Sequence, residues 1–200
     1  MLIRVDDYPF DKFYDKYQIR DRENLWFEFI HQLNLPCCVG VIPSTCNLIE
    51  IDQLKRSDVE VEIAAHGLYH KRNEFDGDDC HNKIALMKQI MEQNNINCTN
   101  FIPPFNKLTE KMCCSLSDLN FKIVQGHPDF KINSKYKFKY MPFTWYGLAK
   151  DFLDFDFSKN SMYDILTLHL PWEEQYFDQK YLCKLRDRIQ QYVIPWSRVI

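Results

Sequence analysis

The strongest constraint on the fold is a regular alternation of short apolar segments and longer amphipathic ones along the chain. Val59, Val61 and Ile63 alternate with glutamates, which is the period-two pattern of a half-buried strand. Cys37–Ile42 is a continuous apolar run ended by Pro43, as expected of a strand buried on both faces. Alternating strands and helices indicate a parallel sheet. We therefore predict an α/β fold whose sheet is either open or closed into a barrel.

Further segments extend this pattern. The other predicted strands are Leu2–Val5, a short segment before Pro103, Phe121–Val124 and Ile165–Leu168. The predicted helices are Asp21–Leu33, one with an apolar stripe from Ile84 to Met91, and one from about Glu174 to Tyr192. Acidic residues at 76, 78 and 79 suit the start of the second helix and lack the spacing of a calcium loop. Residues Ser134 to Trp145 fit neither pattern.

Length and composition limit the class of protein. The chain has 200 residues, so we expect one domain over residues 1–200. Hydrophobic residues make up 46% and aromatic residues 15%, which excludes a disordered chain. The net charge of −3 supplies no basic field for nucleic acid. No apolar run reaches the length of a membrane span, so we expect none.

The eight cysteines are scattered and form no Cys-x-x-Cys pair. Adjacent cysteines on a strand would point to opposite faces, so each doublet would chelate a metal poorly. Free cysteine packs like a small apolar side chain, and we favour reduced, buried thiols over disulfides or a zinc cluster. The first residues also lack the apolar core of a secretory signal. We therefore expect a cytoplasmic protein.

Polar residues gather where four of the predicted strands end. The pair Asp6-Asp7 follows the first strand, and His66 and His70 follow the third. A Pro103-Pro104-Phe105 turn follows the fourth strand, and His169 ends the last one. Because the carboxyl ends of parallel strands form the active face of α/β folds, we expect these residues to share one rim.

Each piece has a plainer alternative when taken alone. On a helical turn, His66 and His70 would lie on one side and could share a metal, although packing or capping histidines have the same spacing. Asp6-Asp7 could be a turn or a helix cap. Consecutive residues nevertheless point in different directions, so one acid could bind metal while the other faces substrate. His169 alone could be a structural histidine.

Taken together, four segments resemble the motifs of the polysaccharide deacetylase family, the metal-dependent chitin, peptidoglycan and related glycan deacetylases. Their order and rough spacing match that family, and the resemblance extends from residue 1 to about residue 172. The four segments are Val5-Asp6-Asp7, His66-Gly67-Leu68-Tyr69-His70, Phe101-Ile102-Pro103-Pro104-Phe105 and Ile165-Leu166-Thr167-Leu168-His169.

The resemblance implies a distorted, incomplete (β/α) barrel and a role for each matched residue. Asp6 would be the general base and His169 the general acid. One divalent metal, zinc or alternatively Co²⁺, Fe²⁺ or Ni²⁺, would be held by Asp7, His66 and His70. A backbone N–H near Phe105 would stabilise the oxyanion. The rim that meets substrate and oxyanion would consist of Tyr69, Pro104 and Phe105.

The sequence also departs from the family pattern. Ile102 stands where the family has an arginine that pairs with the catalytic aspartate. Residues two apart on a strand share a face, so we hypothesise that Arg4 replaces it, the alternative being a surface ion pair. Tyr8-Pro9 replaces a glycine after the two acids, and the family's fourth motif is missing. Tyr69, Phe105, Trp145 and Trp172 could face a sugar ring or pack in the core.

The function predicted from these residues is hydrolysis of an N-acetyl or other N-acyl group on an amino sugar. The expected substrates are a sugar-nucleotide, a lipid-linked sugar or an oligosaccharide. Two alternatives remain open. The chain could be a catalytically silent barrel that binds a glycan or a partner protein, or it could cleave a different amide or an O-acetyl ester.

Overall fold

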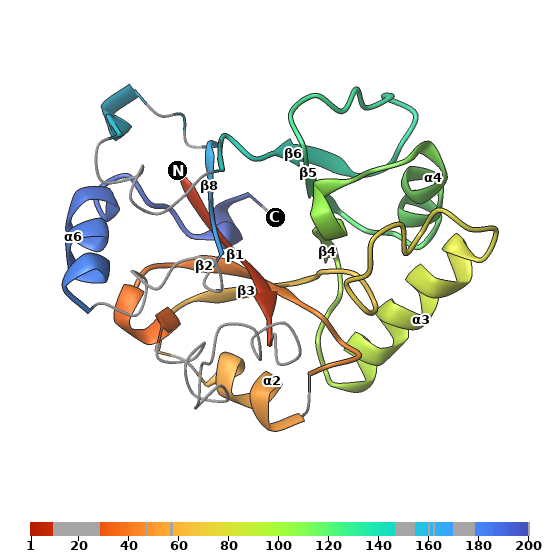
Figure 1. The fold of residues 1–200 in the computed structure, drawn as a ribbon, viewed down its shortest axis with the longest axis horizontal. Helices are drawn as coiled ribbons and strands as arrows, with labels where there is room; N and C mark the ends of the chain where they lie inside the picture. The colour runs from red at the N-terminus through yellow and green to blue at the C-terminus, as the bar shows by residue number, and fades with distance from the viewer. Residues whose placement is uncertain are drawn as a thin grey trace.

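The computed structural model of the chain describes residues 1–9, 29–46, 48–56, 58–146, 155–159, 161, 163–169 and 179–199. Eight strands form a single sheet in the order β6-β5-β4-β3-β2-β1-β8-β7, and all seven neighbouring pairs are parallel. The predicted α/β class with a parallel sheet is therefore confirmed. Helices lie around the outside of the sheet (Figure 1).

The strands are β1 Leu2–Tyr8, β2 Cys37–Val41, β3 Val61–Ala65, β4 Asn100–Phe101, β5 Ile123–Gly126, β6 Lys139–Pro142, β7 Trp145–Tyr146 and β8 Ile165–Leu168. The helices are α2 Leu48–Lys55, α3 Cys80–Gln93, α4 Glu110–Asp118 and α6 Gln179–Ile189. Residues 29–33 are also helical. The described residues also include three short 3₁₀ turns, η2 Pro104–Asn106, η3 Phe157–Lys159 and η6 Trp196–Arg198.

The sheet curls into an incomplete barrel because its two edge strands are consecutive in the chain. Only Phe143 and Thr144 separate β6, which pairs with β5, from β7, which pairs with β8. The backbone N–H of Phe143 still donates to Gly126 on one edge, and that of Thr144 donates to Ile165 on the other. One extended segment thus changes partners across the seam. This decides between the open sheet and the barrel, and it accounts for the segment 134–145 that the sequence pattern left unassigned.

The two faces of the sheet bury different clusters. The outer face packs Ile3, Val5 and Val39 against apolar side chains of the surrounding helices. The inner face carries Leu2, Cys38, Ala64, Ile102, Ile123, Met141 and Ile165, together with Trp196. The indole N–H of Trp196 donates to the carbonyl of Ile3 at 2.7 Å, and its ring is 1% exposed.

Inner positions become polar toward the carboxyl ends of the strands. Along β1 the inner residues are Leu2, Arg4 and Asp6, because alternate residues share a face. The same alternation leads from Ile165 through Thr167 to His169 at the end of β8, and from Ala64 to His66 at the end of β3. The barrel thus delivers an acid and two imidazoles to one rim above an apolar floor.

Most predicted elements are present, with shifted ends. Strand β8 matches its predicted bounds, whereas β1 continues three residues beyond Val5 through both acids. Of the predicted helix at 21–33, residues 29–33 are helical, and 21–28 lie outside the described residues. Residues 174–178 of the last predicted helix also lie outside them. Helices α2 and α4 were not predicted, although Thr109 caps α4 by accepting the N–H of Met112.

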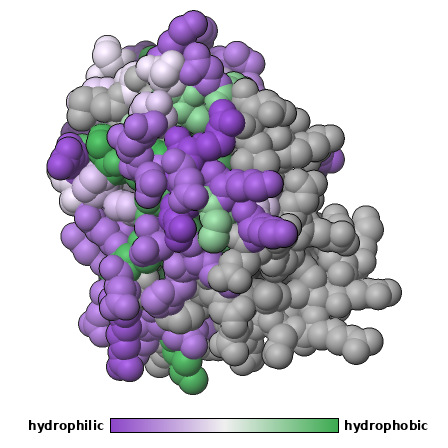
Figure 2. Space-filling model, turned by 90° about the vertical axis from the view of Figure 1, so that its left-hand side faces the viewer, coloured by the Kyte–Doolittle hydropathy of each residue, from purple (hydrophilic) through white to green (hydrophobic). Residues whose placement is uncertain are grey.

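All eight cysteines are free thiols, five of them buried. None of the helices in the described ranges combines the length and apolarity needed to cross a membrane. On the face that carries α6, hydrophilic side chains cover most of the coloured surface (Figure 2). Each of the three aspartates before α3 forms an ion pair with a lysine. The pairs are Asp76–Lys107, Asp78–Lys111 and Asp79–Lys83.

Candidate active site

A bulge in β1 aims two neighbouring acids at the same rim. The register between β1 and β2 shifts between Val5 and Tyr8. Asp7 lies in this bulge with φ of 73°, in the left-handed region that non-glycine residues seldom adopt. A regular strand would turn Asp6 and Asp7 to opposite faces of the sheet. Here both carboxylates contact histidines at the carboxyl end of the barrel. Asp7 contacts His66 and His70, and Asp6 contacts His169.

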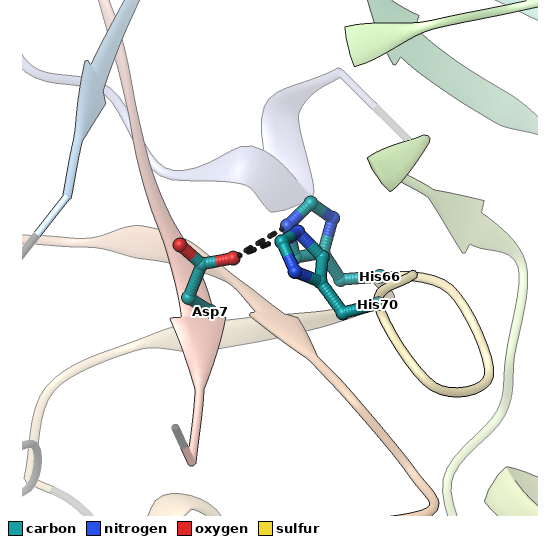
Figure 3. A group of neighbouring side chains, drawn as sticks. All are labelled: Asp7, His66 and His70. Carbon is teal, nitrogen blue, oxygen red and sulfur yellow. Dashed lines mark hydrogen bonds and ion pairs between the residues drawn. The ribbon is translucent and has the colours of Figure 1, made fainter. Parts of the chain in front are cut away.

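Asp7 meets His66 and His70 (Figure 3). Its Oδ1 atom lies 2.9 Å from Nε2 of His66 and 3.1 Å from Nε2 of His70. One potential ligand atom from each of the three residues lies within 4.8 Å of the others. Asp7 is 3% exposed and His66 is 2% exposed, so the cluster is shielded from bulk water.

The loop that carries the two histidines is not helical, which corrects the geometry expected from their spacing. Gly67 has φ of 78° and His70 has φ of 51°, so the chain turns sharply at both ends of the motif. A side chain at Gly67 would meet Pro104 at 2.4 Å. The imidazoles therefore converge through a tight loop packed on the proline turn, and glycine is required for that close approach.

A buried carboxylate holds this loop in place. Oε1 of Glu74 accepts the backbone N–H groups of Leu68 and Tyr69, both at 2.8 Å, and Oε2 accepts that of Lys71 at 3.3 Å. Glu74 is only 8% exposed. The sequence pattern gave no signal for this role, because it depends on how the loop folds back on itself.

The donor set fits a divalent metal. Three ligand atoms at about 2.0–2.2 Å from one zinc ion stand roughly 3 Å apart, which is close to the two separations seen here. The carbonyl of Ile102 can only accept, so Nδ1 of His66, 3.0 Å away, donates to it. That bond leaves Nε2 of His66 facing Asp7, the orientation that outer partners impose on ligand histidines.

The protonation states of the two imidazoles differ. Burial lowers the pKa of His66, but the charge of Asp6 and the hydrogen bond to Asp7 outweigh it and raise that pKa above its usual value. Burial, aided by the charge of His66, lowers the pKa of His70 to about 4. His70 is therefore neutral near pH 7, whereas the two acids favour the protonated form of His66, and a bound metal ion would compete with that proton.

Asp6 has its own cationic partner. Nε of Arg4 donates to Oδ1 of Asp6 at 2.7 Å, and Nη2 donates to Oδ2 at 2.5 Å. Burial disfavours the ionised form of Asp6, but the charges of Arg4 and His66 outweigh it and hold the pKa well below its usual value. Nη2 of Arg4 also donates to Oδ1 of Asn106 at 2.7 Å. Arg4 is 0% exposed, so the surface ion pair considered as an alternative is wrong.

The remaining rim residues lie on both sides of these two clusters. Nε2 of His169 is 3.3 Å from Oδ2 of Asp6. The Phe105 ring stacks on His70 with centroids 4.9 Å apart, while Phe105 and Tyr69 are about half exposed. Pro104 is buried against the histidine loop. Trp145 instead packs on Phe155 and Phe157, away from the rim, and Trp172 lies outside the described residues.

Comparison with solved structures identifies the fold. A family 4 acetyl xylan esterase from Clostridium thermocellum, in complex with a cobalt ion, shares 14% identity, with a TM-score of 0.63 over 99% of this chain and 88% of that one. A peptidoglycan N-acetylglucosamine deacetylase shares 13% identity, with a TM-score of 0.62 over 98% and 86%. The chain has the polysaccharide deacetylase fold. This confirms the incomplete barrel that the resemblance implied.

The polysaccharide deacetylase fold does not by itself specify a reaction. A 4-alpha-glucanotransferase from Thermococcus litoralis matches with a TM-score of 0.64 and 11% identity, over 98% of this chain and 38% of that one. No protein-family model and no curated protein sequence matches the chain. Function must therefore be argued from the side chains at the rim.

The cationic partner of Asp6 comes from the same strand as the acid itself. Ile102 stands where the resemblance expects an arginine, and its side chain packs into the barrel. The guanidinium comes instead from β1 itself. Asn106 steadies it from the turn after β4, which is a contact that sequence reasoning missed.

The Arg4–Asp6 pair gives a stability prediction. Arg4→Ala should destabilise the fold by about 3–5 kcal/mol, because it leaves a buried carboxylate without its counter-charge. The double variant Arg4→Ala, Asp6→Ala should cost clearly less than the sum of the two single changes, since it removes both charges. Denaturant unfolding measures the free energies, with the exposed Arg198→Ala as a matched control expected within about 0.5 kcal/mol of wild type. Additive single changes would contradict a coupled pair.

Proposed function

We propose that the protein is a metal-dependent carbohydrate deacetylase that removes an acetyl or related acyl group from an amino sugar or glycan precursor. The observation that carries this proposal is the division of labour between the two adjacent acids. Asp7, His66 and His70 form a donor set suited to one divalent metal. Asp6, one residue earlier, instead forms ion pairs with Arg4 and His169. Amide hydrolysis needs both kinds of group within one site.

In this proposal Asp6 accepts the proton of the attacking water. Its carboxylate is ionised at neutral pH, as the lowered pKa requires. Three of its roughly four acceptor positions are used by Arg4 and His169, which leaves one for the water. Arg4 therefore orients Asp6 as well as keeping it charged.

His169 protonates the departing nitrogen. Its Nε2 atom faces the acid that collects the proton, so acid and base flank the same point on the rim. The backbone N–H at Phe105 is proposed to donate to the oxygen that gains charge on the acyl carbon. The Phe105 ring, stacked on His70, supplies an apolar wall for the acyl group or the sugar.

The metal is proposed to be held by Asp7, His66 and His70. When bound, a divalent ion polarises the acyl carbonyl and lowers the pKa of water, the chemistry that zinc, cobalt or iron can supply with one carboxylate and two imidazoles. Asp7 is suited to this role because its carboxylate stays ionised. Burial alone would raise the pKa of Asp7, but the hydrogen bond and charge of His66 outweigh burial and lower that pKa.

Acetate release from acetylated sugars tests the proposal. Protein loaded with Zn²⁺ or Co²⁺ should release acetate from at least one of N-acetylglucosamine, its short β-linked oligomers, a nucleotide-linked N-acetyl sugar and acetylated xylan. An O-acetyl ester as the only substrate would change the reaction from amide to ester hydrolysis. If the protein binds these sugars but releases no acetate, the proposed deacetylase activity is contradicted and the catalytically silent barrel is favoured.

A further inference from the structure

The rim continues into a second hollow beside the metal-binding loop. A pocket of about 210 Å³ lies between the segment after His70 and the turn around Pro104 and Phe105. That volume holds roughly seven water molecules, enough for a small ionic substituent of a sugar. Phe105 joins this pocket to the proposed active site, because it lines the pocket while its ring stacks on His70.

The charged side chains of the pocket are three cations and two acids, and both acids are already engaged. The carboxylate of Glu74 accepts hydrogen bonds from three backbone N–H groups of the histidine loop. Asp76 accepts from Nζ of Lys107 at 2.7 Å, and the same ammonium also donates to the side chain of Asn73. These contacts pair Lys107 with Asp76 and Glu74 with the loop backbone, and in the described part of the chain neither acid forms an ion pair with the other two cations.

Lys71 and Arg72 are the cations that remain. Both are exposed, and neither forms an ion pair with any residue in the described part of the chain. The Lys71 ammonium lies 5.3 Å from the centroid of the Tyr69 ring, which keeps it at the rim. Arginine offers a planar fork that matches the oxygens of a phosphate or carboxylate, and lysine adds a point charge.

We propose that this pocket is a subsite for an anionic substituent of the substrate, a phosphate or a carboxylate, bound by Lys71 and Arg72 next to the sugar that is deacylated. The inference rests on the proposed deacetylase function and narrows its substrates to acidic sugars. The anion is attached to the same molecule as the acyl group, and Phe105 is the wall that both parts share.

Paired substrates test the subsite. N-acetylglucosamine 1-phosphate carries a phosphate, N-acetylmuramic acid carries a carboxylate, and N-acetylglucosamine carries neither. Wild-type protein should show a kcat/KM at least about tenfold higher for one acidic sugar than for the neutral one, since hydrogen bonds to charged groups are strong. The acidic sugar that is favoured identifies the anion. The preference should weaken with added salt, because exposed charges are screened.

The variant Lys71→Ala, Arg72→Ala should abolish most of this preference, chiefly through a higher KM for the acidic sugar. The control variant Lys122→Ala, Arg198→Ala removes the same charge from two exposed positions, one immediately before β5 and one in η6, and should keep the preference. An equal preference in the wild type and the pocket variant would overturn the subsite.

A binding measurement separates failure of the subsite from failure of the proposed function. Calorimetric titration with N-acetylglucosamine 1-phosphate and with inorganic phosphate needs no turnover. If no sugar is hydrolysed, the deacetylase proposal fails, whereas an affinity about tenfold lower in the pocket variant than in the control still supports the anion site. Equal affinities in both variants overturn it, whatever the enzyme activity.

Discussion

Replacing both His66 and His70 with alanine should remove bound metal and acetate release together. The two imidazoles supply two of the three converging ligand atoms, so Asp7 alone remains. Metal affinity should fall by more than about 100-fold, because the loss of an outer partner of a ligand alone costs about 10- to 100-fold. Elemental analysis after dialysis against Zn²⁺, followed by acetate assays on the same samples, measures both effects.

The matched control removes two histidines that lie elsewhere. His81 and His127 are exposed, and the imidazole of His127 contacts Asp129 and the ring of Phe143, away from the donor set. The variant His81→Ala, His127→Ala should keep one metal per chain and wild-type activity. If both double variants bind the same amount of metal, the ion is not held by Asp7, His66 and His70, and the proposed site is wrong.

Asp6→Asn should abolish turnover while leaving the metal in place. The amide keeps the shape of the side chain but cannot accept the proton of water, so kcat should fall by about 10²- to 10⁴-fold. Metal content should stay near one ion per chain, because Asp6 forms ion pairs with Arg4 and His169 and does not belong to the three-residue donor set. Steady-state kinetics and elemental analysis on the same preparation provide the two readouts.

Two further measurements make the test of Asp6 specific. The variant Asp129→Asn changes an exposed acid beside His127 and should leave kcat unaltered. A thermal unfolding curve for Asp6→Asn shows whether the fold survives the loss of charge opposite Arg4. If a folded Asp6→Asn protein loses its metal, Asp6 is a metal ligand. If the Asp6→Asn protein keeps the kcat of the wild type, Asp6 is not the general base.

Much of the candidate site could be predicted because its residues follow strands. Asp6, His66 and His169 continue the inner faces of β1, β3 and β8, and alternation along a strand is a local property of the sequence. The pairing of Arg4 with Asp6 follows from the same spacing, since residues two apart share a face. The face on which each of these residues lies, and the Arg4–Asp6 pair, depend only on neighbouring residues of the chain.

Other contacts depend on how distant segments meet. The spacing of His66 and His70 suggested a helical turn, whereas Gly67 and Glu74 fold the loop against Pro104. Asn106 reaches Arg4 across 102 positions of sequence. The bulge at Asp7 arises from the shifted register with β2, which no pattern within β1 records.

The sequence by itself determined the α/β class, the strands that end in polar residues and the identity of the acids and histidines. These follow from short-range periodicity, which decides which side chains share a face. Only the tertiary structure decided that the sheet closes, since β6 and β7 change partners across a seam, and only it showed the cationic pocket beside Phe105. Both depend on pairing and charge balance between segments far apart in the chain, where local periodicity carries no information.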